Sequence, residues 1–305
     1  MASLKSIKTK IISYKKTGTV THAMEAVSAV KMRKSQERAL AGRAYAAAAL
    51  SVLKRLAGTA DAERHALVRE QLGKTCFVVI TSDKGLAGSL NSAVIRRVED
   101  EIRSRALPKN DIVIIAVGRR GGDYFTSRGY DVRVKHENVG DGVSESDIRM
   151  VTDNILAWHA AGEIGACVIA YQNFLSTFEQ EAGVRQIVPI TQEMITDMVK
   201  HIRPVKGKYA PAAAEEDKGP DVYTIEPDAD EVLSVLLPKL LNTAIFHAFL
   251  EAKASEHSAR MVAMKNATDK AKEMASDLTR TFNKVRQAVI TREVSEITSG
   301  IEAMK

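Results

Sequence analysis

The residues whose types and spacing could support chemistry lie in segment 81–91, which reads TSDKGLAGSLN. An apolar, β-branched run precedes this segment, and a helical pattern follows it. A glycine loop between a strand and a helix can bind phosphate, because backbone N–H groups at a helix N-terminus can donate to an anion. Gly85 and Gly88 give only G-x-x-G, however, which matches neither the dinucleotide fingerprint nor the P-loop. The segment is a weak nucleotide site, and a tight turn is the structural alternative.

Other reactive side chains lack the spacing that catalysis or metal binding requires. The seven histidines are scattered, and His257 has no second ligand at helical distance, so no zinc site is predicted. The chain has no Gly-x-Ser-x-Gly elbow. Cys76 and Cys167 each lie in an apolar, strand-like run and are predicted to be reduced core residues. The sequence therefore predicts no catalytic residue, no metal and no cofactor.

The element most able to position a site is a helix predicted from about Glu231 to Lys305. Beyond Pro238 this stretch contains no proline and only one glycine, Gly300, so nothing stops the helix. At ~1.5 Å per residue it would be a rod on the order of 100 Å long, which a compact domain of this mass cannot bury. We expect this helix to project from the rest of the chain.

Apolar residues recur along this helix at a mean spacing of about 3.6 residues, which is typical of one narrow helical stripe. The stripe requires one long partner, and a core-facing helix or a dimeric coiled coil is the general alternative. The stripe comprises Met264, Ala267, Ala271, Met274, Leu278, Phe282, Val285 and Val289, with a second phase at Val294, Ile297, Ile301 and Met304.

The N-terminal residues 1–58 supply that partner. They contain no proline and are predicted to be helical, with a local weakening at residues 17–19. Because the rest of the chain lies between the two helices, we expect them to pair antiparallel as a coiled coil. The predicted N-terminal stripe comprises Leu4, Ile7, Ile11 and Tyr14, followed in a shifted phase by Val20, Met24, Val27 and Val30.

Between the two long helices the pattern changes to short β-branched runs alternating with helical segments. Such alternation predicts an α/β fold with a mostly parallel sheet covered on both faces, in which the last two strands can pair antiparallel. We expect strands at 76–81, 111–117, 131–135, 166–171 and 184–189, and helices at 92–105, 120–127 and 145–161.

These patterns predict three parts of the chain. Residues 1–58 form the N-terminal coiled-coil helix, residues 59–230 form the α/β body, and residues 231–305 form the C-terminal coiled-coil helix. Within the body, segment 203–230 carries four of the seven prolines and is predicted to be an exposed connector.

Charge is distributed unevenly around a net value of +6. Residues 1–58 hold twelve Lys or Arg and only two acids, which favours an acidic partner surface. Few aromatic residues lie among the basic positions, so nucleic acid is a weaker alternative. No run reaches the roughly 18 uninterrupted apolar residues of a membrane span, and the N-terminus lacks the apolar core of an export signal.

Three helical segments resemble the gamma subunit of F-type ATP synthase, of the bacterial type. They are THAMEAVSAVKMRKSQ at 21–36, SEHSARMVAMKNATDKAKEM at 255–274 and TFNKVRQAVITREVSEITSGIEA at 281–303. The loop SDKGLAG at 82–88 is similar to the family's signature loop, with Ala87 in place of the usual cysteine. His22 and Val30 depart from the family pattern, which favours a basic and a small residue there.

The resemblance implies a long antiparallel coiled coil of the N- and C-terminal helices plus a Rossmann-like α/β domain with a five-stranded mixed sheet. It implies a central rotor shaft that couples rotation of the c-ring to the conformational cycle of the catalytic β subunits, without catalysis by this chain. The implied partners are three α and three β subunits, the epsilon subunit and the c-ring, with no nucleic acid and no direct membrane insertion. The implied location is the cytoplasmic face of the bacterial inner membrane.

Matching residue by residue predicts which side chains make these contacts. Contacts with β are expected at Met24, Lys31, Arg33, Lys84, Arg286, Gln287 and Thr291, and an upper bearing at Ile297, Ile301 and Met304. A nucleotide-binding α/β protein with a regulatory basic coiled coil remains the alternative function, and a basic scaffold for nucleic acid is a third.

Overall fold

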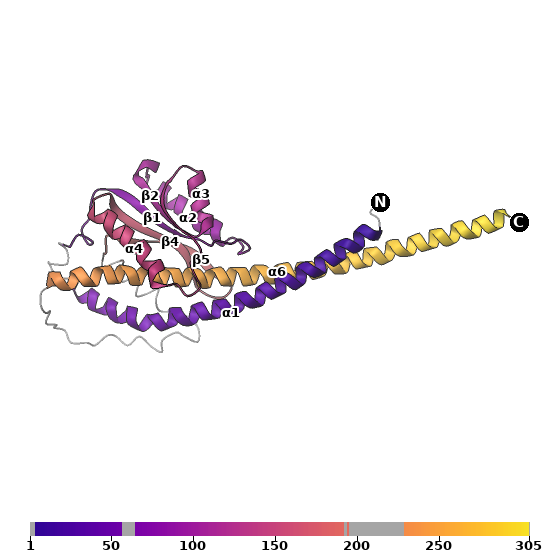
Figure 1. Cartoon of the computed structure of the whole chain (residues 1–305), viewed down its shortest axis with the longest axis horizontal. Helices are drawn as coiled ribbons and strands as arrows, with labels where there is room; N and C mark the ends of the chain where they lie inside the picture. Colours follow the sequence, from indigo (N-terminus) through magenta and orange to yellow (C-terminus); the bar gives the residue numbers. More distant parts are fainter. Residues whose placement is uncertain (1–3, 57–64, 192–193, 195–228, 305) are drawn as a thin grey trace. The chain divides into compact units, whose positions relative to one another are not determined.

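A computed structural model of the chain describes residues 4–56, 65–191, 194 and 229–304 (Figure 1). Within the two long helices, side chains are described for residues 4–38 and 231–304. The elements are α1 (Leu4–Leu56), β1 (Lys74–Ile80), α2 (Leu90–Ser104), a 3-10 turn (Lys109–Asp111), β2 (Ile112–Val117), α3 (Arg119–Ser127), β3 (Asp131–His136), α4 (Glu145–Ala160), β4 (Ile164–Phe174), β5 (Gln180–Val188) and α6 (Ala229–Ala303).

The chain divides into two units. Residues 30–259 form the first, which we call the body unit; residues 4–29 and 260–304 form the second, which we call the coil unit. The predicted boundaries at 58/59 and 230/231 fall on or beside residues outside the described ranges, so that division remains a prediction. The predicted connector 203–230 also lies outside the described residues, except for its last two residues, which begin α6.

The body unit contains one five-stranded sheet in the order β3-β2-β1-β4-β5. The first four strands run parallel, and β5 pairs antiparallel with β4 (Figure 1). All five predicted strands and the three predicted helices between them are present, with ends displaced by a few residues. The predicted mixed α/β sheet is confirmed.

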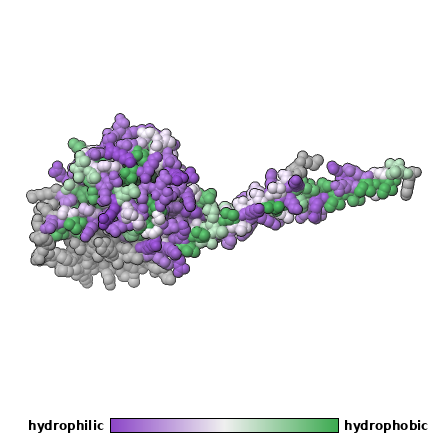
Figure 2. Space-filling view, viewed as in Figure 1, coloured by the Kyte–Doolittle hydropathy of each residue, from purple (hydrophilic) through white to green (hydrophobic). Residues whose placement is uncertain are grey.

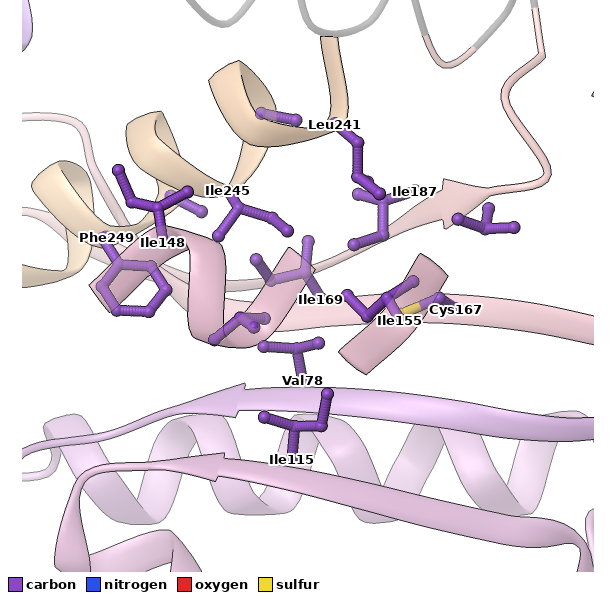
Figure 3. Close-up of a cluster of buried hydrophobic side chains, with 14 of the residues drawn as sticks. Val78, Ile115, Ile148, Ile155, Cys167, Ile169, Ile187, Leu241, Ile245 and Phe249 are labelled. Atoms are coloured by element: carbon purple, nitrogen blue, oxygen red, sulfur yellow. The ribbon is translucent and has the colours of Figure 1, made fainter. Parts of the chain in front are cut away.

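Both faces of the sheet are covered, which explains why the central strands read as continuous apolar runs. Every residue of β2 is buried. On one face Val79 and Ile114 pack with residues of α2 and α3. On the other face Val78 and Ile169 pack with residues of α4 and α6 (Figure 3).

The N-terminal part of α6 is a core helix of the body unit. Its buried residues include Leu237, Leu241, Ile245 and Phe249, which recur every four residues and meet side chains of the sheet (Figure 3). The sequence analysis treated this helix as a projecting rod from its start, and for these residues that interpretation is wrong. The apolar face of α6 is wider here because it packs against a sheet, whereas in the coil unit it packs against one helix.

Helix α6 is also the one described element that is long and apolar enough to cross a membrane by length and composition. This finding qualifies the expectation that no run approaches a membrane span. The buried leucines and isoleucines that pack on the sheet account for much of the apolar character of its first turns.

The coil unit pairs α1 with α6 antiparallel. Thr21 Oγ1 lies 2.6 Å from Thr268 Oγ1, and a Cβ added to Gly18 would lie 3.6 Å from the Cβ of Ala271. From the pair Gly18–Ala271 to the pair Thr21–Thr268, the residue number in α1 rises by three and the residue number in α6 falls by three, as an antiparallel register requires. Extending this register places Leu4 level with residue 285 of α6, so the last turns of α6 extend beyond the first described turn of α1.

The contact stripe of α1 differs from the predicted one. Val20, Val27 and Val30 are 55–59% exposed, and no change of phase occurs after Tyr14. The stripe instead continues at an unbroken 3-4 spacing, which is typical of a coiled-coil seam. Its buried or half-buried members are Leu4, Ile7, Ile11, Tyr14, Gly18, Thr21, Glu25 and Ser28.

The stripe of α6 is corrected in the same way. Met274 is exposed, whereas Thr268 and Ala275 are buried beside the predicted members Met264 and Ala271. Small residues lie at the seam because they let two backbones approach closely. Burial of the threonines is possible because Thr21 Oγ1 donates to Thr17 O and Thr268 Oγ1 to Met264 O, so neither hydroxyl lacks a hydrogen bond.

The corrected seam predicts different effects of one charge at two positions of α6 that lie outside the groove described below. Met264→Asp should lower the free energy of unfolding of the coil by about 3 kcal/mol, because the carboxylate would be buried in the seam and level with Glu25 of α1. Asn266→Asp should change it by less than ~0.5 kcal/mol, because Asn266 is exposed. Urea unfolding of the full chain followed by circular dichroism measures both; equal effects would contradict the assigned seam.

Candidate functional site

The signature loop, residues 81–91, is held by hydrogen bonds within the chain. Asn91 Oδ1 accepts from the backbone N of Ser82 at 2.9 Å, and Asn91 Nδ2 donates to Ser82 Oγ at 2.8 Å. Asn91 therefore does not cap α2. Helix α2 begins at Leu90, and its N-cap residue Ser89 makes no side-chain cap bond.

Asp83 joins this loop to two neighbouring connections. Its Oδ1 accepts from the backbone N of Arg119 at 3.1 Å, and its Oδ2 accepts from the backbone N of Asn138 at 3.0 Å. Gly118, at φ +87°, lies so close to the loop that an added Cβ would be 2.1 Å from Thr81 O. The carboxylate thus fixes three loops at the carboxyl ends of adjacent strands, and its acceptors are occupied by backbone donors.

The space beside the loop is too small for a nucleotide. A cavity of about 10 Å³, lined by Ser82, Asp83, Gly118, Lys253 and Glu256 among others, has room for about one water molecule. Ligand pockets are usually about 300–1,000 Å³. This geometry favours the tight-turn interpretation of the loop, which presents Lys84 and Leu86 to solvent.

The hydrogen bonds of Asp83 predict a difference between it and the next residue. Asp83→Ala should lower the free energy of unfolding by about 1–3 kcal/mol, because two backbone N–H groups lose their acceptor. Lys84→Ala should cost less than ~0.5 kcal/mol, since Lys84 is exposed. Chemical denaturation of both variants tests this, and a larger loss for Lys84→Ala would show that the turn is assigned incorrectly.

The two cysteines, remote in sequence, lie opposite each other on neighbouring strands β1 and β4. Both are free and fully buried, as predicted. Burial, followed by the hydrogen bond with Cys76, raises the pKa of the Cys167 thiol well above its usual value. A thiol that stays protonated is a poor nucleophile. Within the described residues, no group of three or more His, Cys, Asp or Glu side chains is arranged to hold a metal ion.

The predicted β contacts of the coil unit lie in two separate places. Met24 is half-buried and lies level with Lys265 in the antiparallel register. Arg286, Gln287 and Thr291 are exposed and lie about 21–26 residues further along α6, or roughly 30–40 Å. These three residues follow residue 285, which lies level with Leu4, the first described residue of α1.

The predicted β contacts of the body unit are also exposed, and two of the three have ion-pair partners in the chain. Lys31 Nζ lies 2.8 Å from Asp141 Oδ2, and Arg33 Nε lies 3.3 Å from Glu37 Oε1. Lys84 projects from the signature loop. Lys31 and Arg33 lie on α1, whereas Lys84 follows β1.

The end of α6 exposes a line of apolar side chains (Figure 2). The three predicted bearing residues, Ile297, Ile301 and Met304, are 64%, 56% and 91% exposed, and Ile290 and Val294 are at least half exposed. A contiguous line of exposed apolar side chains is typical of a surface that another protein covers.

Sequence reasoning missed a groove on the coil unit. Its volume is about 680 Å³, and its cationic lining comes from Lys15, Lys272 and Arg280. The signal for it was the pair of small residues Gly18 and Ala275, which leave the side of the seam open. The remaining lining residues are Tyr14, Thr19, His22, Ala271, Ser276, Thr279 and Asn283.

Comparison with known proteins identifies the family. The family model described as ATP synthase matches residues 3–304. The "ATP synthase gamma chain" of Desulforamulus reducens is 37% identical over 309 residues, with all of both chains covered, and that of Heliobacterium modesticaldum is 35% identical over 306 residues, again with full coverage.

Solved structures agree at the level of the fold. A chain from the Euglena gracilis mitochondrial ATP synthase (OSCP/F1/c-ring, rotational state 3) has a TM-score of 0.65 at 17% identity, covering 99% of this chain and 94% of that one. A chain from the Tetrahymena thermophila central stalk and c-ring has a TM-score of 0.59 at 21% identity, covering 81% of this chain and 99% of that one. With full-length relatives above 30% identity, the chain belongs to the gamma-chain family of F-type ATP synthase, the family of the central rotor shaft.

Proposed function

We propose that the chain is a non-catalytic subunit that works as the rotor shaft of an F-type ATP synthase and couples c-ring rotation to the β subunits. The observation that carries this proposal is the coil unit, whose narrow seam of small residues continues into an exposed apolar end that has no helical partner among the described residues. Such an end is suited to turn inside a sleeve of other subunits.

Coupling requires that the shaft contact the catalytic subunits unequally. A β site changes affinity only as far as the shaft interacts differently with its conformational states. The proposed β contacts are Met24, Lys31, Arg33, Lys84, Arg286, Gln287 and Thr291, and the proposed bearing is Ile297, Ile301 and Met304. Lys31 can make such a contact as well as its bond to Asp141, because an ammonium has three N–H donors.

The charge of the coil supports acidic partner segments. Groove residues Lys15, Lys272 and Arg280 are cationic, and an acidic segment of β would be attracted to them. We propose three α and three β subunits around the coil, and the epsilon subunit and the c-ring at the body. The complex would lie at the cytoplasmic face of a bacterial inner membrane, which the bacterial relatives support.

Co-purification tests the proposal most directly. A tagged copy of the full chain, expressed with α and β subunits, should recover both at three copies per chain and yield an ATPase whose activity depends on β. Binding of ATP to the isolated chain with micromolar affinity would contradict the non-catalytic role. Failure to recover α and β would contradict the shaft itself.

A further inference from the structure

One carboxylate in the body unit connects three elements. Asp141 lies in the connection between β3 and α4. Its Oδ2 accepts from Lys31 Nζ of α1 at 2.8 Å, and its Oδ1 accepts from His257 Nε2 of α6 at 2.8 Å. Because a carboxylate only accepts, Nε2 of His257 carries the proton in this bond. We call these three residues the Asp141 joint.

The Asp141 joint lies close to the boundary between the two units on both long helices. Lys31 follows the end of the first coil segment, Ala29, by two residues, and His257 precedes the start of the second, Arg260, by three. The joint therefore acts where both helices leave the body unit. Arg38, two turns from Lys31 on α1, adds a second link by donating from Nη1 to the backbone O of Asp141 at 3.1 Å.

The connection that carries Asp141 is itself fixed to the body. Val139 and Val143 are buried in the core, and the backbone N of Asn138 donates to Asp83 of the signature loop. Val143 has φ +45°, which is an outlier for a β-branched residue and persists only where the surroundings determine it. A rigid connection of this kind can transmit force, whereas an exposed loop held at its ends alone would bend.

The electrostatics keep the joint charged. Burial alone would raise the pKa of Asp141, but the hydrogen bond from Lys31 and the interaction with His257 outweigh it, so the pKa lies below its usual value. The carboxylate is therefore ionised at neutral pH. His257 is almost completely buried, which protects its half of the joint from solvent.

We propose that Asp141 is a positioning residue for rotary coupling, which locks α1 and α6 to the body at the point where both helices leave it. With the joint closed, a turn of the body passes to the coil with little angular slack. This inference rests on the proposed shaft function. It adds to that function a residue outside the proposed contact set.

The test measures torsional stiffness in the assembled enzyme. The α and β subunits are immobilised, a bead is attached to the body unit, and the angular variance of the bead is recorded during a catalytic pause. Asp141→Asn keeps the shape of the side chain and removes its charge, so it should raise this variance. The rise should be limited to about twofold, because the hydrogen bond from Arg38 to the backbone O of residue 141 remains. Asp153→Asn, an exposed acid on α4 of the same unit, is the matched control and should leave it unchanged.

A double-mutant cycle tests whether two side chains act through one bond or whether each substitution softens the body unit independently. His257→Phe should raise the variance as Asp141→Asn does, and the double variant should rise no further, because both changes weaken the same bond between His257 and Asp141. Asp141→Glu, which keeps the carboxylate, should restore part of the stiffness. Additive effects, or an unchanged variance in Asp141→Asn, would overturn the inference while leaving the shaft intact. Absence of rotation with the wild-type chain would instead refute the shaft function.

Discussion

Arg286→Glu is expected to leave the ATP synthase assembled and to reduce proton-driven ATP synthesis by at least tenfold. Arg286 is exposed on the part of α6 that extends beyond Leu4, so the substitution should not disturb the seam. A guanidinium offers five donors in a rigid fork and stays charged at any working pH. If an acidic segment of β encloses it in one rotary position, loss of the pair costs about 2–5 kcal/mol, and reversal of the charge adds repulsion.

The assay is ATP synthesis in inverted membranes, with subunit content measured on a gel. Lys265→Glu is the matched control, because Lys265 is also an exposed cation of α6 but lies outside the predicted contact set. A pair that stays in solvent is worth less than ~1 kcal/mol, so this variant should lose much less activity. Near-normal synthesis by the Arg286→Glu enzyme would remove Arg286 from the coupling contacts.

Phe249→Ala is expected to lower the free energy of unfolding of the chain by about 3–5 kcal/mol. Phe249 is 1% exposed and packs between α6 and the sheet, where it meets residues of α4 such as Ile148 (Figure 3). Removal of the ring leaves a cavity that two fixed elements cannot fill. Because a domain is stable by only about 5–15 kcal/mol, the body would be close to unfolding at physiological temperature.

The matched control is Phe178→Ala at the turn between β4 and β5. Phe178 is 79% exposed, so the same change of side chain should alter stability by less than ~0.5 kcal/mol. Thermal and urea unfolding of both variants provide the comparison. A small effect at Phe249 would mean that α6 does not cover this face of the sheet in solution.

The signature loop shows which part of a local structure the sequence predicts and which part it does not. The glycines and the neighbouring strand and helix patterns correctly predict a turn at this place. They do not show that Asp83 binds the backbone of Arg119 and Asn138, because those residues follow other strands and meet Asp83 only when the sheet assembles. The choice between a phosphate site and a closed turn therefore depends on the tertiary structure.

The seam of the coil shows the limit of hydrophobicity as a guide. Valines at 20, 27 and 30 are the more apolar candidates, yet the buried positions are Gly18, Thr21 and Ser28. Helix packing selects side chains by the space between two backbones, and small residues permit the closer approach. The unbroken 3-4 spacing was present in the sequence, but a polar residue at a buried position becomes favourable only after its hydroxyl finds an acceptor.

The sequence by itself determined the elements: the β-branched runs define the strands, and two long stretches without proline, residues 1–58 and the residues after Pro238, define the two long helices. The resemblance of segments 21–36, 255–274 and 281–303 also identified the family. Tertiary structure alone decided the joint of Lys31, Asp141 and His257, which lie more than a hundred residues apart along the chain. Local patterns record periodicity and propensity, whereas a bond between remote residues depends on how the sheet and both helices pack, which no short segment encodes.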